Sequence, residues 1–215
     1  MLRRRLMKSD GDFVNLGLPS GLLWAKGNIV KNGDKYEIGE ETAYGAYVSW
    51  GNIVPHFSSN GSSFDDGYDW GDDNSGPYAE TPGATIEFIE AGEGFAEDSG
   101  YDAARELLGG ECKMPTKDDF VELYNNCTWA WVENYNGSSV KGQLFTSKIN
   151  GARLFFPAAG RGENTYISHL SIYGYYWSRS LYDAERGYYL SFMHRGVYPQ
   201  SMWYRYCGCS VRAVK

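Results

Sequence analysis

The chain has 215 residues, which is enough for one large domain or two small ones with a buried core. Its 18 tyrosines and 7 tryptophans argue against a disordered chain, because disordered segments are poor in aromatic residues. The net charge of −7 gives the surface no reason to attract nucleic acid or an anionic membrane, so we expect neither as a partner.

The start of the chain predicts a disordered lead-in over residues 1–12, followed by a single domain over residues 13–215. Met1 to Lys8 is basic but lacks the apolar run that a signal peptide needs, so we expect no export signal. No stretch approaches the ~20 apolar residues of a membrane span, so we expect no transmembrane segment. Phe13 to Trp24 is typical of two strands joined by a Pro-Ser-Gly turn, and Tyr44 to Trp50 predicts another packed segment.

Residues 58–100 predict an acidic insertion that runs over the surface, because Gly, Ser, Asp, Glu and Pro dominate them. Between Tyr36 and Ala104 there is no Lys or Arg, whereas 15 of the 27 acidic residues lie there. The richest run, Asp65 to Asn74, lacks the alternating carboxylates of a calcium-binding loop. We therefore expect a solvated loop, with no metal site and no cofactor.

Two helices follow the insertion. Asp102 to Leu108 has an apolar stripe and is ended by two glycines at 109 and 110. Thr116 to Asp119 resembles a capping box, which predicts a helix from Lys117 to Asn126. Its apolar side chains recur at helical spacing, at Phe120, Leu123, Tyr124 and Cys127.

Beyond Thr128 the pattern is one of strands and turns. The Asn-Gly pairs at 136–137 and 150–151 favour tight hairpins, since both residues tolerate positive φ. Strands are predicted at Trp129–Val132, Gln143–Ser147, Arg153–Pro157, Tyr173–Trp177 and Tyr188–Phe192. The order of strands, helices and strands predicts an α+β domain with segregated helices.

Catalytic patterns are missing from the sequence. His56, His169 and His194 lie in unrelated contexts, and no nucleophile elbow, Walker loop or dinucleotide fingerprint occurs. Cys112 and Cys127 are interpreted as buried free thiols. We therefore expect a protein that is not an enzyme.

The stretch from Met193 to Cys209 mixes Tyr, Trp, Met, Arg and His without the alternation of a half-buried strand. These residue types are enriched at binding hot spots. We interpret Trp177, Leu190, Phe192 and Val211 as core residues, and we expect an exposed binding surface at Tyr198, Trp203, Tyr204 and Tyr206.

Several motifs in order resemble the Fibrobacter succinogenes major paralogous domain, a family common in gut Bacteroidetes. The match runs from about Phe13 to Val214, without the acidic insertion, and rests on Val14–Ala25, Tyr44–Trp50, Met114–Trp129, Leu154–Gly160, Tyr173–Ser178 and Ser210–Arg212. This resemblance implies a C-type lectin-like α+β fold, with mainly antiparallel strands, two short helices and long irregular loops.

The chain also resembles the variable proteins of diversity-generating retroelements, in bacteria or their phages. In these proteins the C-terminal codons for exposed residues are rewritten while the fold stays constant. The resemblance implies a variable region at about 177–209 with framework positions at Tyr176, Trp177, Ser178, Tyr189, Leu190, Phe192, Val197, Arg205, Gly208, Ser210, Val211 and Arg212. It implies ligand-contact positions at Arg179, Tyr182, Arg186, Tyr188, Met193, His194, Arg195, Tyr198, Ser201, Trp203, Tyr204, Tyr206, Cys207 and Cys209.

These observations predict a monomeric, non-enzymatic binding protein that presents a diversified C-terminal surface to a protein or glycan on a cell surface. Its carrier would be a cell envelope or a phage particle. One alternative is a structural surface or fimbria-like module. A second is a sulfatase-modifying protein similar to the formylglycine-generating enzyme, with Cys207 and Cys209 as a redox pair.

Overall fold

The structure is a computed structural model that describes residues 11–71 and 93–215. The expected lead-in up to residue 10 lies outside the described residues. The same holds for residues 72–92 of the expected acidic insertion, including the end of its Asp-rich run.

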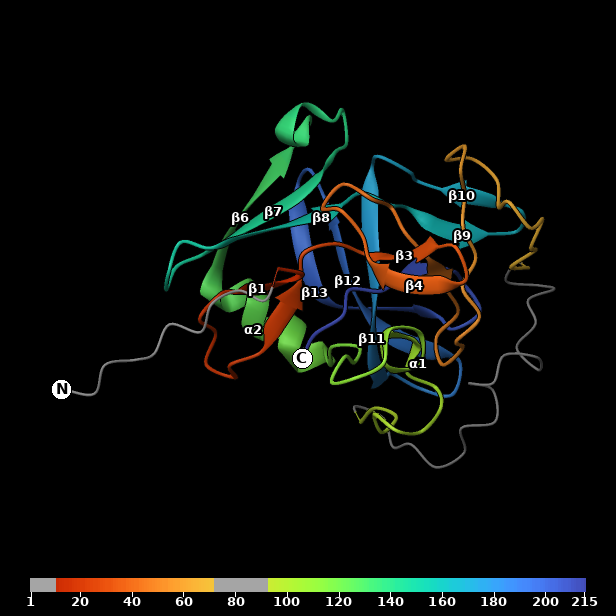
Figure 1. The fold of residues 1–215 in the computed structure, drawn as a ribbon, viewed down its shortest axis with the longest axis horizontal. Coiled ribbons are helices and arrows are strands. Elements are labelled where there is room, and N and C mark those ends of the chain that lie inside the picture. The colour runs from red at the N-terminus through yellow and green to blue at the C-terminus, as the bar shows by residue number, and fades with distance from the viewer. Residues whose placement is uncertain (1–10, 72–92) are drawn as a thin grey trace.

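A five-stranded sheet in the order β13-β12-β11-β14-β5 forms the centre of the protein (Figure 1). Its neighbours pair antiparallel except β11 and β14, which are parallel. The strands are β5 (Tyr47–Val48), β11 (Tyr173–Leu181), β12 (Arg186–Met193), β13 (Gly196–Tyr204) and β14 (Cys209–Ser210). The sheet therefore joins a segment near the N-terminus to the last part of the chain.

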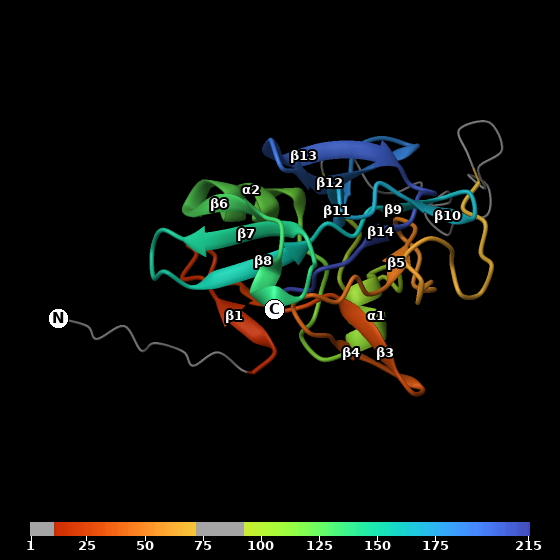
Figure 2. The ribbon, with the colours of Figure 1, turned by 90° about the horizontal axis from the view of Figure 1, so that it is seen from above.

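Smaller sheets surround this one (Figure 2). A three-stranded sheet contains β6 (Cys127–Val132), β7 (Gly142–Ser147) and β8 (Arg153–Pro157). Three two-stranded sheets pair β1 (Phe13–Asn15) with β2 (Leu23–Ala25), β3 (Ile29–Asn32) with β4 (Lys35–Ile38), and β9 (Arg161–Glu163) with β10 (Tyr166–Ser168). The predicted Pro-Ser-Gly hairpin is confirmed, with Phe13 opposite Ala25.

Both predicted helices are confirmed. Helix α1 (Ala103–Leu108) begins after Asp102, whose carboxylate accepts from two backbone N–H groups, and ends at Gly109 with φ 70°. Helix α2 (Lys117–Asn126) has the capping box that the sequence predicts. The Thr116 hydroxyl accepts from the Asp119 N–H at 3.1 Å, and the Asp119 carboxylate accepts from the Thr116 N–H at 2.7 Å.

The predicted C-type lectin-like α+β class is wrong. Strands make up about 40% of the structure and helices about 10%, so the protein is mostly β. The two helices have only 6 and 10 residues and cover parts of sheets without forming a helical layer. The β3–β4 and β9–β10 hairpins form in segments for which no strand was predicted from the sequence.

The Asn-Gly pair at 136–137 was expected to close a tight hairpin, and this prediction is also wrong. Asn136 and Gly137 do take positive φ values, of 51° and 77°. They lie, however, in a short 3-10 helix, Tyr135–Gly137, within the longer connection from Val132 to Gly142. The side chain of Tyr135 stacks on Phe155 at 3.9 Å, so this connection packs against β8 as an element of its own.

The central sheet is buried on both of its faces. On one face, Tyr176 and Phe192 pack in a core with Phe120 of α2. On the other face, Trp177 and Tyr189 pack in a second core with α1. A strand covered on both faces shows no alternation of apolar and polar residues, which explains the unbroken aromatic runs of the C-terminal sequence.

The acidic segment was expected to run over the surface. Its described ends instead contribute to the core. Phe64, Trp70 and Phe95 are all buried. Trp70 lies against Gly162 and Gly208, where an added Cβ would come within 2.4 Å and 2.5 Å of its indole ring. These two glycines therefore make room for the large side chain that anchors the segment.

A buried arginine connects the two ends of the chain. Arg212 is 0% exposed and donates hydrogen bonds to the Asn28 side chain at 3.0 Å and to the carbonyls of Ala25 at 3.0 Å and Lys26 at 2.7 Å. Its guanidinium lies 4.4 Å from the ring centroid of Phe156. Burial lowers the pKa of Arg212, so these acceptors and the aromatic face are what hold its charge in the core.

Replacing Arg212 with Ala should cost more than about 3 kcal/mol of unfolding free energy, because two buried acceptors and one partly buried acceptor lose their donor at roughly 1–3 kcal/mol each. Urea denaturation measures the change. The control is Arg195→Ala at the exposed β12–β13 turn, which should change the free energy by no more than about 0.5 kcal/mol. Equal effects of the two substitutions would contradict the role assigned to Arg212.

Candidate functional site

In the C-terminal region, the expected framework positions and the expected ligand-contact positions differ in burial. All twelve framework positions are buried. Of the fourteen contact positions, eleven are exposed or partly exposed and three are buried. Substitutions at exposed positions usually change stability little, whereas truncations in a core leave cavities. The exposed positions are therefore the ones that could vary without loss of the fold.

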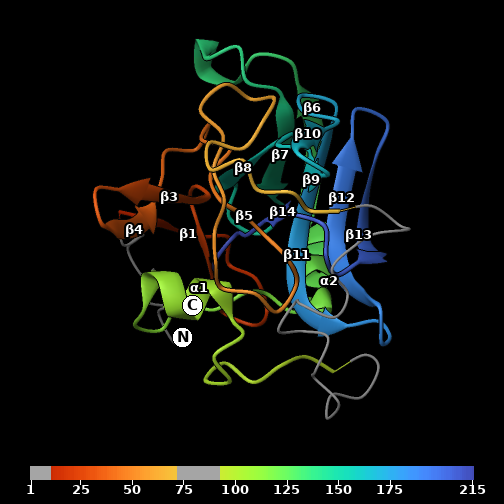
Figure 3. The same cartoon turned by 90° about the vertical axis from the view of Figure 1, so that its right-hand side faces the viewer.

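Strand β13 forms an edge of the central sheet. The strand order leaves one side of β13 without a neighbouring strand among the described residues. Pro199 lies within β13, and a proline without an N–H is tolerated at a sheet edge because it interrupts no ladder there. Figures 2 and 3 show β13 along the outside of the molecule. Side chains of β13 therefore lie along an accessible edge of the central sheet.

Four of the contact positions come together where β11 leads into β12. Tyr182 and Tyr188 meet edge to face, with ring centroids 5.2 Å apart. The Arg186 guanidinium lies 4.6 Å from the ring centroid of Tyr182, and its Nε donates to the Asp183 carboxylate at 2.9 Å. The strand register places Tyr204 directly opposite Arg186. We call these residues, with Met202, the tyrosine patch: Tyr182, Arg186, Tyr188, Met202 and Tyr204.

The tyrosine patch occupies a single face because of the register. Arg186 faces Tyr204 and Tyr188 faces Met202 across the two strands, and directly paired residues share a face of the sheet. All five side chains are partly exposed. Lys117, at the start of α2, adds a positive charge 5.7 Å from the centroid of Tyr188. The patch thus combines aromatic faces, a thioether and two cations.

Ser201 and Trp203 lie on the opposite face of β13. Ser201 forms a hydroxyl pair with Ser191 of β12 at 2.8 Å. The indole of Trp203 is covered by the Arg161 guanidinium, which lies 4.3 Å from its ring centroid and also pairs with Glu163. Trp203 is consequently held in place from one side, and it belongs to a different surface from the tyrosine patch.

A third group lies at the other end of these strands, around the turn that joins β12 to β13. It consists of Met193, His194, Arg195 and Tyr198, and we call it the turn group. Tyr198 is 48% exposed, and the Arg195 Nε donates to the His194 imidazole at 3.2 Å. Tyr204 lies six positions along the extended strand from Tyr198, a span of roughly 20 Å. The expected contact positions therefore form separate groups and no single continuous site.

Three expected contact positions lie in the core, and for these the predicted exposure is wrong. Tyr206 is 2% exposed, Cys207 is 0% exposed and Cys209 is 1% exposed. The chain turns inward after β13, where Gly208 exchanges two backbone hydrogen bonds with Gly162. Burial also raises the pKa of Cys209, so this thiol is poorly suited to act as a nucleophilic thiolate.

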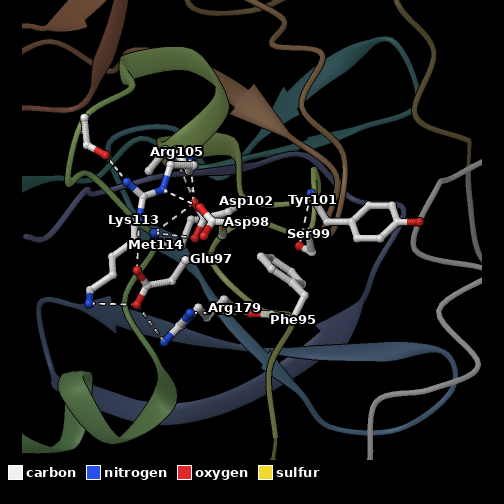
Figure 4. A network of polar contacts seen from close by, with 12 residues as sticks. Phe95, Glu97, Asp98, Ser99, Tyr101, Asp102, Arg105, Lys113, Met114 and Arg179 are labelled. Atoms are coloured by element: carbon white, nitrogen blue, oxygen red, sulfur yellow. Dashed lines mark hydrogen bonds and ion pairs between the residues drawn. The ribbon is translucent and has the colours of Figure 1, made fainter.

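Arg179 is part of an ion network that fixes the end of the acidic segment (Figure 4). Glu97 accepts hydrogen bonds from Lys113 and from Arg105, each at 2.9 Å, and lies 3.7 Å from Arg179. The hydrogen bond from Lys113 is the largest cause of the lowered pKa of Glu97. Arg179 therefore serves to join β11 to the segment at 95–97, in addition to any contact with a ligand.

Sequence reasoning missed a cavity of about 580 Å³ on the other side of the fold. It lies between the β3–β4 hairpin and residues 55–66, and Tyr36, Phe57 and Asp65 are among its lining. Asp65 lies in the segment expected as a surface insertion, whereas Tyr36 and Phe57 lie outside it. Only their proximity in space reveals the cavity, and no local signal predicts it.

Within the described residues, no His, Cys, Asp and Glu side chains form a group of three that could hold a metal ion. Among the helices of residues 11–71 and 93–215, none is long and apolar enough to cross a membrane. Comparison with protein-family models, curated proteins and solved structures finds no match for this chain. The family resemblance therefore stays a prediction that rests on the sequence motifs.

Glu97→Gln should lower the melting temperature at pH 7, and its effect should shrink progressively as the pH falls below 4.5. Because the pKa of Glu97 is lowered from 4.5 in the folded protein, its stabilisation is present above that value and is lost as the pH falls through the lower folded pKa. Melting curves over this pH range measure the difference. Asp98→Asn is the control, since the Asp98 side chain is 92% exposed and should contribute little at any pH.

Proposed function

We propose that this protein is a non-enzymatic binding protein, diversified by a retroelement, whose tyrosine patch and turn group contact the ligand. The observation that carries the proposal is the division of β11, β12 and β13 into buried framework positions and accessible contact positions. Such strands keep the same core while their accessible side chains change. The motifs that resemble the Fibrobacter succinogenes major paralogous domain support the same proposal.

The composition of the tyrosine patch favours a protein or glycan ligand on a cell surface. Tyr182, Tyr188 and Tyr204 offer rigid aromatic faces with few rotatable bonds, which lose little entropy on binding. Arg186 is held by Asp183 and keeps its guanidinium over Tyr182. Tyrosine and arginine dominate the energetics of many interfaces. The carrier that we propose is a cell envelope or a phage particle.

The burial of the two tail cysteines weighs against the sulfatase-modifying alternative. A redox or nucleophilic pair needs accessible thiols of low pKa, whereas Cys207 and Cys209 are buried and the pKa of Cys209 is raised. The structural-module alternative makes no use of variable contact positions. It differs from our proposal in predicting that the tyrosine patch binds nothing.

Replacing Tyr182, Tyr188 and Tyr204 together with Ser should leave the protein folded, because all three side chains are partly exposed. The same change should abolish binding to a partner identified by a glycan or surface-protein screen, since aromatic anchors can contribute about 2 kcal/mol or more each. Binding is measured by calorimetry, and folding by the melting temperature.

The matched control is Tyr206→Ser, the same chemical change at a buried tyrosine of the same segment, which should cost roughly 3–5 kcal/mol of stability. If the triple variant unfolds, or if it binds the partner with unchanged affinity, the structural module becomes the better explanation. A near-copy of the 3′ coding end beside a reverse-transcriptase gene, with differences concentrated at adenines, is the expected genomic finding.

A further inference from the structure

The cavity beside the β3–β4 hairpin is separate from the proposed ligand surface. Its lining comes from residues 30–66, and none of its lining residues belongs to β11, β12 or β13. Figures 2 and 3 show the β3–β4 hairpin and β13 on opposite sides of the molecule. With a volume of about 580 Å³, the cavity lies in the size range of small-molecule sites.

One wall of the cavity is aromatic and built on paired backbone. The rings of Tyr36 and Phe57 are nearly parallel, with an interplanar angle of 8° and centroids 6.3 Å apart. Tyr36 is held by the pairing of β4 with β3. Phe57 follows His56, which exchanges two backbone hydrogen bonds of 2.9 Å with Tyr47 of the central sheet. Because both rings rest on ordered backbone, the wall is formed before any ligand arrives.

The other side of the cavity contains two carboxylates. Asp65 Oδ1 accepts from the backbone N–H of Ser59 at 2.9 Å and from its hydroxyl at 2.8 Å. Its second oxygen, Oδ2, has no hydrogen-bond partner within the described part of the chain. Asp66 is held by the His56 imidazole at 2.6 Å. The free oxygen of Asp65 is therefore positioned by its neighbours and available to a ligand.

The local charge favours a cation. Most of the lining comes from residues 36–66, a segment without Lys or Arg, and the one basic residue of the lining is the exposed Lys31 on β3. Aromatic faces attract a cation through the negative potential above the ring, and a nearby carboxylate adds a charge interaction. A neutral ligand would gain only the aromatic contact.

We propose that this cavity binds a small organic cation with a substituted ammonium head. The alkyl groups of the head pack against Tyr36 and Phe57, and its positive charge faces the free oxygen of Asp65. The volume beyond the head leaves room for a short organic chain. This site is independent of the tyrosine patch, so one protein would present two binding surfaces.

Choline is a suitable probe, and 3,3-dimethylbutan-1-ol is its neutral isostere. In NMR-detected titrations at constant ionic strength, we expect saturable binding of choline with at least tenfold higher affinity than that of the isostere. Tyr36→Leu and Asp65→Asn should each weaken choline binding about tenfold while the melting temperature stays close to that of the unsubstituted protein, because both side chains are partly or largely exposed.

The control variant is Asp118→Asn, which removes the same charge on the exposed side of α2 and should leave choline binding unchanged. The triple tyrosine-patch variant should also bind choline normally, which separates this proposal from the one above. No saturable choline binding at millimolar concentrations, equal affinity for the neutral isostere, or full affinity in Asp65→Asn would each overturn the proposal.

Discussion

The buried guanidinium of Arg212 is the constraint on which the arrangement of the two chain ends depends. A charged group without water needs acceptors in place, and Arg212 finds them on Asn28 and on the carbonyls of Ala25 and Lys26. Asn28 in turn donates to the hydroxyl of Tyr176 on β11 and to the carbonyl of Tyr44. One network thus fixes the N-terminal segment, the central sheet and the C-terminus relative to one another.

Hydrophobic cores lie on both faces of the central sheet. Once both faces are covered, side chains on β11 and β12 have little access to solvent except near the strand ends and beside the edge strand β13. The tyrosine patch and the turn group lie in those places. The fold therefore separates positions that maintain the core from positions that can meet a ligand, which is the property that a diversified binding protein requires.

The acidic half of the chain has a structural role of its own. Trp70 packs against Gly162 and Gly208, and Glu97 gathers Lys113, Arg105 and Arg179 around one carboxylate. These contacts tie both described ends of the acidic segment to the sheet that presents the contact positions. The same segment lines the cavity at Asp65 and Asp66, which places two carboxylates in a cavity that also has an aromatic wall.

The sequence alone determined those helices and hairpins that depend on interactions between residues close together in the chain. The capping box at Thr116 and Asp119, the helical spacing of Phe120 and Leu123, and the Pro-Ser-Gly hairpin after Phe13 depend on neighbours within a few residues. Most of the predicted strands also form, although the Asn-Gly pair at 136–137 makes a packed connection and no tight hairpin.

Only the tertiary structure decided which faces of the strands are buried, because burial depends on packing against segments that are far away in the sequence. It buried Tyr206, Cys207 and Cys209 and engaged Arg179 with Glu97. It also divided the remaining contact positions into the tyrosine patch, the turn group, and the pair Ser201 and Trp203 on the opposite face of β13. It also brought Tyr36 beside Phe57 and produced a mostly β protein in place of the expected α+β class. Residue type and spacing along the chain carry no information about such non-local packing.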